Sequence, residues 1–349
     1  MPALGKLAGV PHHRLFYDLD AIIEAYTVGK PRALEIFGHD ITIPPPFWEG
    51  ISYGHANALG CELVFPEDSE VATRPIYGSL EKGIDALRQD IDFSASGRIP
   101  YYLDLWKKLQ RAFPEEQLSF GGLKAEGPMT TAWILRGHDF FTDVYDDPPL
   151  AREYLAAVTD SIIQFQRFIR RVNGAPEVSE WGVGLVDDIA AMFRPELWPE
   201  WVIPFEEQYF RGLTTHTGPT TGKRHAHIEN LAPSHLPYLD TMDIYSFDPS
   251  VSPRLTPSLV RDGCRSRFSW LLNPMQLRDF SEENVRRWVE ESVAGGASHL
   301  ELHIERIACD VASARKLAAF LKSAKNGRKK KFMFRWMLFW VQWFTVGRS

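Results

Sequence analysis

Two short runs of the sequence carry imidazole and carboxylate side chains at a spacing of two. His227 and Glu229 lie in the first run, and Glu301 and His303 lie in the second. Residues two apart in an extended strand project to the same side, so each pair should point one way. If both strands end at the same opening, two imidazoles and a carboxylate meet there, which is a known catalytic zinc arrangement with an open fourth position. Because this set lacks sulfur ligands, iron or manganese would also suit it.

The same histidines have a simpler interpretation. Histidines beside strands are often satisfied by buried hydrogen bonds, or they lie on solvated loops, and such groups also gather without any metal. The spacing therefore leaves both interpretations open.

Other carboxylates could assist chemistry at such a site. Asp187 and Asp188 could orient a substrate or hydrogen-bond to metal ligands, although a helix cap or a solvated loop would also explain them. Asp40 could be a polar contact in the opening, or it could only end its strand. Asp248 closes the apolar run 244–247, which places its carboxylate at the C-terminal end of a predicted strand.

A turn is predicted at Gly127 and Pro128, since these residue types favour a change of chain direction. Thr130, two residues further on, is a candidate for substrate contact.

The elements that must position these residues alternate along the chain. Apolar residues at three-to-four spacing predict helices over residues 18–26, 79–88, 100–113, 148–173, 195–212 and 281–294. Short β-like runs fall at residues 118–121, 178–184, 224–228, 244–247, 267–271 and 299–304. This order indicates an α/β fold with a parallel sheet, and closure into a (β/α)8 TIM barrel suits the length. An open doubly wound sheet is the rival, but its dinucleotide-binding form is disfavoured because no Gly-x-Gly-x-x-Gly turn opens a helix.

The composition of the chain limits the kinds of molecule it can bind. The chain has 349 residues, 44% hydrophobic and 24% charged, with no repeat or low-complexity linker, so residues 1–325 are predicted to form one domain. A net charge of −6 argues against nucleic acid as a partner. Three scattered cysteines and the lack of an apolar leader favour a reducing, cytoplasmic location.

The segment 326–349 has a different character. It holds the basic run Arg328 to Lys331, followed by the aromatic-rich stretch Phe332 to Val346. That stretch is too short and too polar to span a bilayer, which needs about 20 apolar residues. It could be an interfacial anchor for peripheral contact with an anionic membrane, a helix packed on its own domain or on a subunit, or a tail without a role.

Several motifs follow one another in the order of a known family. They are Glu35-Ile-Phe-Gly-His-Asp-Ile41 with Ala58 to Glu67, Gly127-Pro-Met-Thr-Thr-Ala132, Tyr145-Asp-Asp-Pro148, Val186-Asp-Asp-Ile189, Arg194-Pro-Glu196 and Val202-Ile-Pro204. From about Arg14 to Leu321, the chain therefore resembles the uroporphyrinogen decarboxylase superfamily. The resemblance implies a uroporphyrinogen decarboxylase-like TIM barrel.

One departure from that family concerns its arginine-rich N-terminal loop. The family's decarboxylases carry "R-Q-A-G-R" there, whereas this chain has His12-His-Arg14 and Lys30-Pro-Arg32. Paired arginines are what would clamp an acidic tetrapyrrole. Decarboxylation of uroporphyrinogen is therefore disfavoured.

In its candidate metal ligands, this chain resembles the corrinoid-dependent methyltransferase branch of the family. That branch holds zinc with a His-x-Cys pair and a later cysteine. Counting back from Leu236-Pro237 places His227 at the family's histidine and Glu229 at its cysteine, and His303 falls close to the second cysteine. The resemblance thus implies a metal site of His227, Glu229 and His303. His225 and Glu301 lie beside these ligands and could support or replace them.

The function implied by the resemblance is a metal-dependent methyltransferase. It would move a methyl group between a small methoxyl, amine or thiol substrate and a corrinoid co-substrate carried by a partner protein, with zinc as a Lewis acid. The expected catalytic residues are Asp40 and Asp188, and the expected substrate contacts are Gly127, Thr130, Asp187 and Asp248. Two alternatives remain: a lyase for a smaller acidic substrate, which would use Asp40 or Asp188 with the histidines, and a non-catalytic binding protein.

Overall fold

Parallel strands form the most regular part of the structure. The computed structural model describes residues 1–215 and 222–326. Within these ranges, five strands pair in the order β1-β2-β3-β4-β5, each with its successor in the chain. Their bounds are Gly182–Val186 (β1), Lys223–His227 (β2), Ile244–Asp248 (β3), Arg267–Leu272 (β4) and His299–Leu302 (β5). Helical segments between consecutive strands make these βα units of a parallel sheet.

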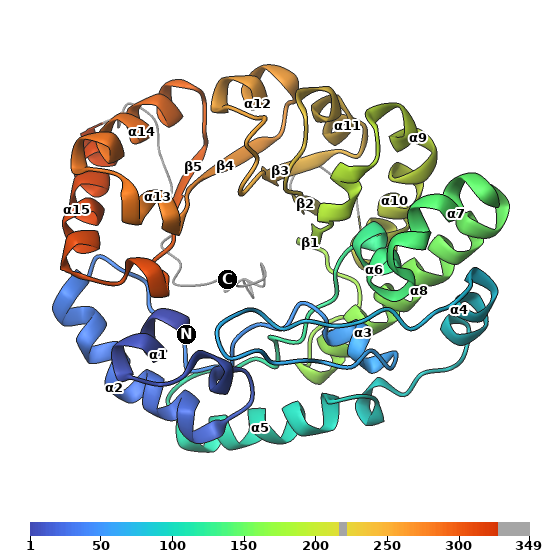
Figure 1. Ribbon diagram of the computed structural model, residues 1–349, viewed down its shortest axis with the longest axis horizontal. Coiled ribbons are helices and arrows are strands. Elements are labelled where there is room, and N and C mark those ends of the chain that lie inside the picture. The colour runs from blue at the N-terminus through green and yellow to red at the C-terminus, as the bar shows by residue number, and fades with distance from the viewer. Residues whose placement is uncertain (216–221, 327–349) are drawn as a thin grey trace.

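The N-terminal half completes the ring with less regular backbone. Ile51 forms an isolated parallel bridge with Leu123. The N–H of Gly127 donates to the carbonyl of Val186 at 2.6 Å, which joins this half to the end of β1. Figure 1 shows β1 to β5 along one side of the ring, irregular backbone of the N-terminal half along the other side, and most helices outside them. The predicted α/β barrel is therefore confirmed.

The helices of the outer layer have the following bounds: Pro2–Ala8 (α1), Leu19–Phe37 (α2), Gly54–Ala58 (α3), Leu80–Leu87 (α4), Ile99–Ala112 (α5), Pro128–Arg136 (α6), Phe140–Asp146 (α7), Pro148–Val172 (α8), Trp198–Trp201 (α9), Ile203–Leu213 (α10), Leu236–Thr241 (α11), Pro257–Gly263 (α12), Pro274–Asp279 (α13), Glu282–Ala294 (α14) and Val311–Asn326 (α15). The longest, α8, begins at Pro148 as predicted, because the Asp147 side chain accepts the Leu150 N–H at 3.1 Å. Tyr154 and Phe165 of α8 are fully buried, and burial of each such ring contributes about 2 to 3 kcal/mol.

Two helix predictions were wrong in their extent. The stretch 195–212 is not one helix, because α9 ends at Trp201 and α10 begins at Ile203. Pro204 lacks the N–H that a continuous helix needs and its ring crowds the preceding turn. Conversely, α2 does not end at Tyr26 but continues to Phe37, with Pro31 inside it.

Two strand predictions also differ from the structure. Residues 118–121 form no strand, and the bridge in this region lies at Leu123. The predicted strand 178–184 lies later, as β1, because Gly182 at φ 135° turns the chain into the sheet. Ser179, before that turn, makes only an isolated bridge with Thr214.

Among the described residues, no helix is both long enough and apolar enough to cross a membrane. The segment 327–349, to which the predicted anchor belongs, lies outside the described residues.

The turn at Gly182 gives a stability prediction. A Cβ added there would lie 2.2 Å from the carbonyl oxygen of Lys223, at a φ that side chains rarely adopt. We expect Gly182→Ala to lower the free energy of unfolding by about 2 to 5 kcal/mol in urea denaturation, through left-handed strain and overpacking. Gly184→Ala is the matched control on the same strand, because nothing lies within 4 Å of its added Cβ. Equal losses in the two variants would contradict this account of the turn.

Candidate functional site

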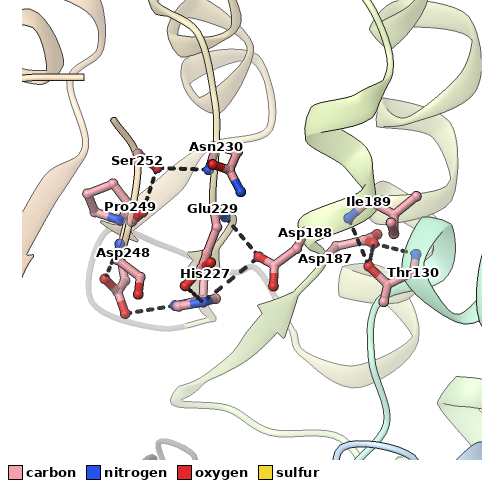
Figure 2. A network of polar contacts seen from close by, with 11 residues as sticks. Thr130, Asp187, Asp188, Ile189, His227, Glu229, Asn230, Asp248, Pro249 and Ser252 are labelled. Carbon is pink, nitrogen blue, oxygen red and sulfur yellow. Dashed lines mark hydrogen bonds and ion pairs between the residues drawn. The ribbon is translucent and has the colours of Figure 1, made fainter. Parts of the chain in front are cut away.

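The C-terminal ends of β1, β2 and β3 bring the candidate residues together. The parallel register pairs Val186 with His227 and His227 with Asp248. His227 is buried, and its Nδ1 lies 2.8 Å from Oδ2 of Asp248. Its Nε2 lies 3.8 Å from Oε1 of Glu229 and 3.9 Å from Oδ1 of Asp188 (Figure 2). One imidazole therefore lies among three carboxylates.

Backbone hydrogen bonds hold the loops around this histidine. The N–H of Glu229 donates to Oδ1 of Asp188 at 2.8 Å, which links the ends of β1 and β2. Asn230 adopts the left-handed φ of 61°, and its N–H donates to the Ser252 hydroxyl at 2.9 Å. Ser252 in turn donates to the Pro249 carbonyl at 2.6 Å (Figure 2). The loops after three neighbouring strands are thus tied to one another.

The charges of the site alter the pKa of its central pair. Burial lowers the pKa of His227, but Asp248, Asp188 and Glu229 outweigh burial, so the pKa is raised overall. Burial alone would raise the pKa of Asp248, yet His227 and the Ser250 N–H hold it below its usual range. An ionised Asp248 accepting from Nδ1 leaves Nε2 as the nitrogen directed at the other two carboxylates.

Asp187 has a different position from its neighbour Asp188. Its side chain is fully buried and accepts hydrogen bonds from Met129 N–H at 3.0 Å, Thr130 N–H at 2.7 Å and the Thr130 hydroxyl at 2.8 Å. These bonds satisfy the first N–H groups of α6, so Asp187 caps the neighbouring helix. Burial raises its pKa. Gly127 is required at this contact, because an added Cβ would lie 2.5 Å from Cβ of Asp187.

A cavity of about 1000 Å³ opens beside the site. Asp188, Glu229, Thr130 and His303 all contribute to its wall. The charged side chains that line it are Glu49, Asp68, Glu70, Glu126, Asp188, Glu229 and Glu305, against Lys6, Lys124 and Arg306.

Two carboxyl groups of this wall have perturbed pKa values. Burial raises the pKa of Glu126 to about 7, and Asp188 adds to the increase. Burial likewise raises the pKa of Glu49 to about 7. Lys124 lies near both glutamates, and burial lowers its pKa.

The remaining predicted residues make contacts with other groups. His303 lines the same cavity, and its Nε2 lies 3.5 Å from Oε2 of Glu301. His225 lies two residues back along β2, where its Nδ1 is 3.0 Å from the Ser246 hydroxyl. Asp40 follows the end of α2, is exposed, and is not among the residues that line the cavity. No strand ends at Asp40, because α2 ends at Phe37 and the chain then turns over residues 38–41.

The described residues include no preassembled group of three or more metal-ligating side chains. The metal site therefore stays a prediction, with His227 facing Glu229 as the sequence spacing indicated. The buried charges at Glu49, Lys124 and Glu126 were missed by the sequence reasoning. Lys124 and Glu126 stand two apart just before the predicted Gly127 turn, and that spacing was the available signal.

Comparisons with known proteins agree with this architecture. Residues 31–326 match the family described as "Uroporphyrinogen decarboxylase (URO-D)". The structure is similar to that of a methyltransferase from Methanosarcina mazei, with a TM-score of 0.63 and 15% sequence identity, over 93% of this chain and 90% of that one. At this identity the likeness shows the fold alone. No curated protein matches the sequence significantly.

The Asp248 contact makes a prediction about the His227 titration. In Asp248→Asn the carboxylate charge is lost while burial remains, so we expect the His227 pKa to fall by roughly one to two units. Histidine ring NMR on chelator-treated protein would measure it. Ser246→Ala, which removes the hydroxyl beside Nδ1 of His225, should leave that titration unchanged. An unaltered His227 pKa in Asp248→Asn would rule out Asp248 as the group that raises it.

The raised pKa of Glu126 predicts how stability depends on pH. Its folded-state pKa of about 7 exceeds the ordinary 4.5, so its ionisation opposes folding and the free energy of unfolding falls as pH rises from 4.5 to 7. We expect Glu126→Gln to be more stable than wild type at pH 8 by up to about 3 kcal/mol. This difference should vanish below pH 4.5, as measured by urea unfolding across pH. Parallel profiles for the two proteins would show that Glu126 ionises normally.

Proposed function

The chain belongs to the uroporphyrinogen decarboxylase family, and we propose that it is a metal-dependent methyltransferase of that family. It would move a methyl group between a small methylated substrate and a corrinoid, carried by a partner protein. The observation that carries this proposal is the position of His227, whose Nε2 faces two carboxylates beside a large cavity.

The donor chemistry fits a divalent metal. Metal-binding histidines commonly hydrogen-bond through the other ring nitrogen to a carboxylate, as His227 does to Asp248. Ligands about 2.1 Å from a tetrahedral ion lie roughly 3.4 Å apart, so separations of 3.8 and 3.9 Å need only small shifts. His227 and Glu229 would hold the ion, with Asp188 or His303 as the third ligand. When bound, zinc would supply Lewis acidity toward a thiol, methoxyl or amine group.

The surrounding residues have defined tasks in this proposal. Asp248 fixes the imidazole tautomer, and Asp188 holds the Glu229 backbone in place. Thr130 donates to Asp187 and accepts the Ile189 N–H at 3.0 Å, so it couples α6 to the loop that carries Asp188. Asp187 would act through this coupling, because it is fully buried.

The charge of the cavity disfavours decarboxylation of uroporphyrinogen, the reaction after which the family is named. Seven carboxylates line it against three basic side chains, and its one arginine among the described lining residues, Arg306, lies 3.2 Å from Asp68. A polycarboxylate tetrapyrrole would meet like charge without a bidentate clamp. The same wall disfavours a lyase for a smaller acidic substrate, and the exposed position of Asp40 removes one of its two expected proton-transfer groups.

Metal content tests the proposal. Plasma mass spectrometry should find about one metal ion per wild-type chain, and none in His227→Ala or Glu229→Gln. Comparing Asp188→Asn with His303→Ala would identify the third ligand, since only the true ligand's variant should lose the ion. His225→Ala is the control that should retain it, because His225 bonds to Ser246.

Failure of wild-type protein to bind metal after reconstitution with zinc, iron or manganese would refute the metal-dependent mechanism. If metal is bound, a change in the cobalamin spectrum on adding methylated substrates would show methyl transfer. A metal-loaded protein with no such change for any methoxyl, amine or thiol donor would refute the methyltransferase itself.

A further inference from the structure

Carboxylates outnumber basic side chains in the cavity wall, and they occur both at its exposed edge and in its buried part. Asp68 lies at its exposed edge, with a side chain that is 85% exposed, and it pairs with Arg306. Glu126 lies deep in the wall and is only 9% exposed. With Asp188 and Glu229 set aside as the proposed metal ligands, five carboxylates of the wall face three basic side chains, so an incoming cation would relieve the remaining repulsion.

Glu126 lies in surroundings that disfavour its charge. Burial is the main cause of its raised pKa, and Lys124 only partly offsets it. A buried charge of this kind is stabilised when an opposite charge comes close. A neutral or anionic substrate would provide no such partner.

Aromatic rings supply a second feature that does not depend on these charges. Phe16, Tyr53 and Trp133 line the same cavity. Tyr53 lies near Glu126 and Glu70, which contribute after burial to its raised pKa. A ring face beside carboxylates is the combination that recognises methylated ammonium groups.

We propose that the methylated substrate of this cavity is a cation, a tertiary or quaternary amine whose N-methyl groups contact the aromatic wall while the carboxylates neutralise its charge. This inference rests on the proposed function and selects among its substrate classes. A cationic nitrogen has no lone pair for a Lewis acid, so the methyl group would pass to reduced cobalt as the carbon–nitrogen electron pair returns to nitrogen, without coordination of that nitrogen by the metal. A methoxyl ether would use the rings but leave the carboxylates unbalanced, and a thiol would use neither feature. Only the methylated ammonium group uses both.

Calorimetric titration can test this without metal or corrinoid. The probes are choline and 3,3-dimethylbutan-1-ol, which has the same shape without the positive charge. We expect choline to bind at least about tenfold more tightly than the neutral alcohol, as a desolvated cation–π contact and an ion pair would give.

Two pairs of variants locate the binding. Glu126→Gln should weaken choline binding several-fold and leave the neutral probe unchanged, whereas Asp68→Asn, at the exposed edge, should change neither. Tyr53→Leu should weaken choline binding, whereas Tyr53→Phe, which keeps the ring, should not. Thermal unfolding of each variant would confirm that it is folded.

Equal affinity for the two probes, no binding of either, or tighter binding of 4-methoxybenzoate would overturn the inference. Its failure is distinguishable from failure of the proposed function. Equal binding of choline and the neutral alcohol would not change the result of the metal analysis. Absence of bound metal would not change the calorimetric comparison, which uses no metal.

Discussion

The hydrogen bond between His227 and Asp248 is the interaction on which the site depends. It exists because β2 and β3 run parallel in a register that sets the last residue of each strand side by side. The bond fixes the ring so that Nε2 faces Asp188 and Glu229, and the resulting charge raises the His227 pKa despite burial. A shift of one residue in either strand would turn the two side chains to opposite faces and remove the site.

Buried negative charge is the second constraint on this region. Asp187 offsets part of its desolvation with three hydrogen bonds from the start of α6, so one carboxylate both caps a helix and joins it to β1. Glu206 of α10 is fully buried, and no hydrogen bond reaches its carboxyl oxygens among the described residues. Burial raises its pKa, which favours the protonated form. At the strand ends, His227 compensates the charge of Asp248, and hydrogen bonds from α6 compensate the burial of Asp187.

Local periodicity explains which features the sequence could predict. The alternation of helices and strands predicted the barrel, and the spacing of two correctly placed His227 beside Glu229. The partner of His227 on the next strand was harder to predict from the sequence, because the register between strands depends on how separate βα units pack. Asp248 was thus expected to contact substrate, whereas the structure places it on His227. Asp188 and Asp187 are adjacent and chemically alike, yet one faces the cavity and the other caps α6. Only the fold of the chain after β1 distinguishes them.

The same limitation explains why the cavity charge was missed while the lack of an arginine clamp was seen. A missing arginine-rich loop is visible in a single stretch of sequence, but the cavity wall is assembled from segments separated by most of the chain, from Glu49 to Glu305. Together these carboxylates make the cavity wall negative, whereas binding of an acidic tetrapyrrole requires a positive wall. In a barrel of this kind, a change in the charge of the cavity wall changes the class of molecule that it can stabilise, and the strand ends can keep their positions. Under the proposed function, the residues around His227 would carry the chemistry, and the rest of the cavity wall would select the charge of the substrate.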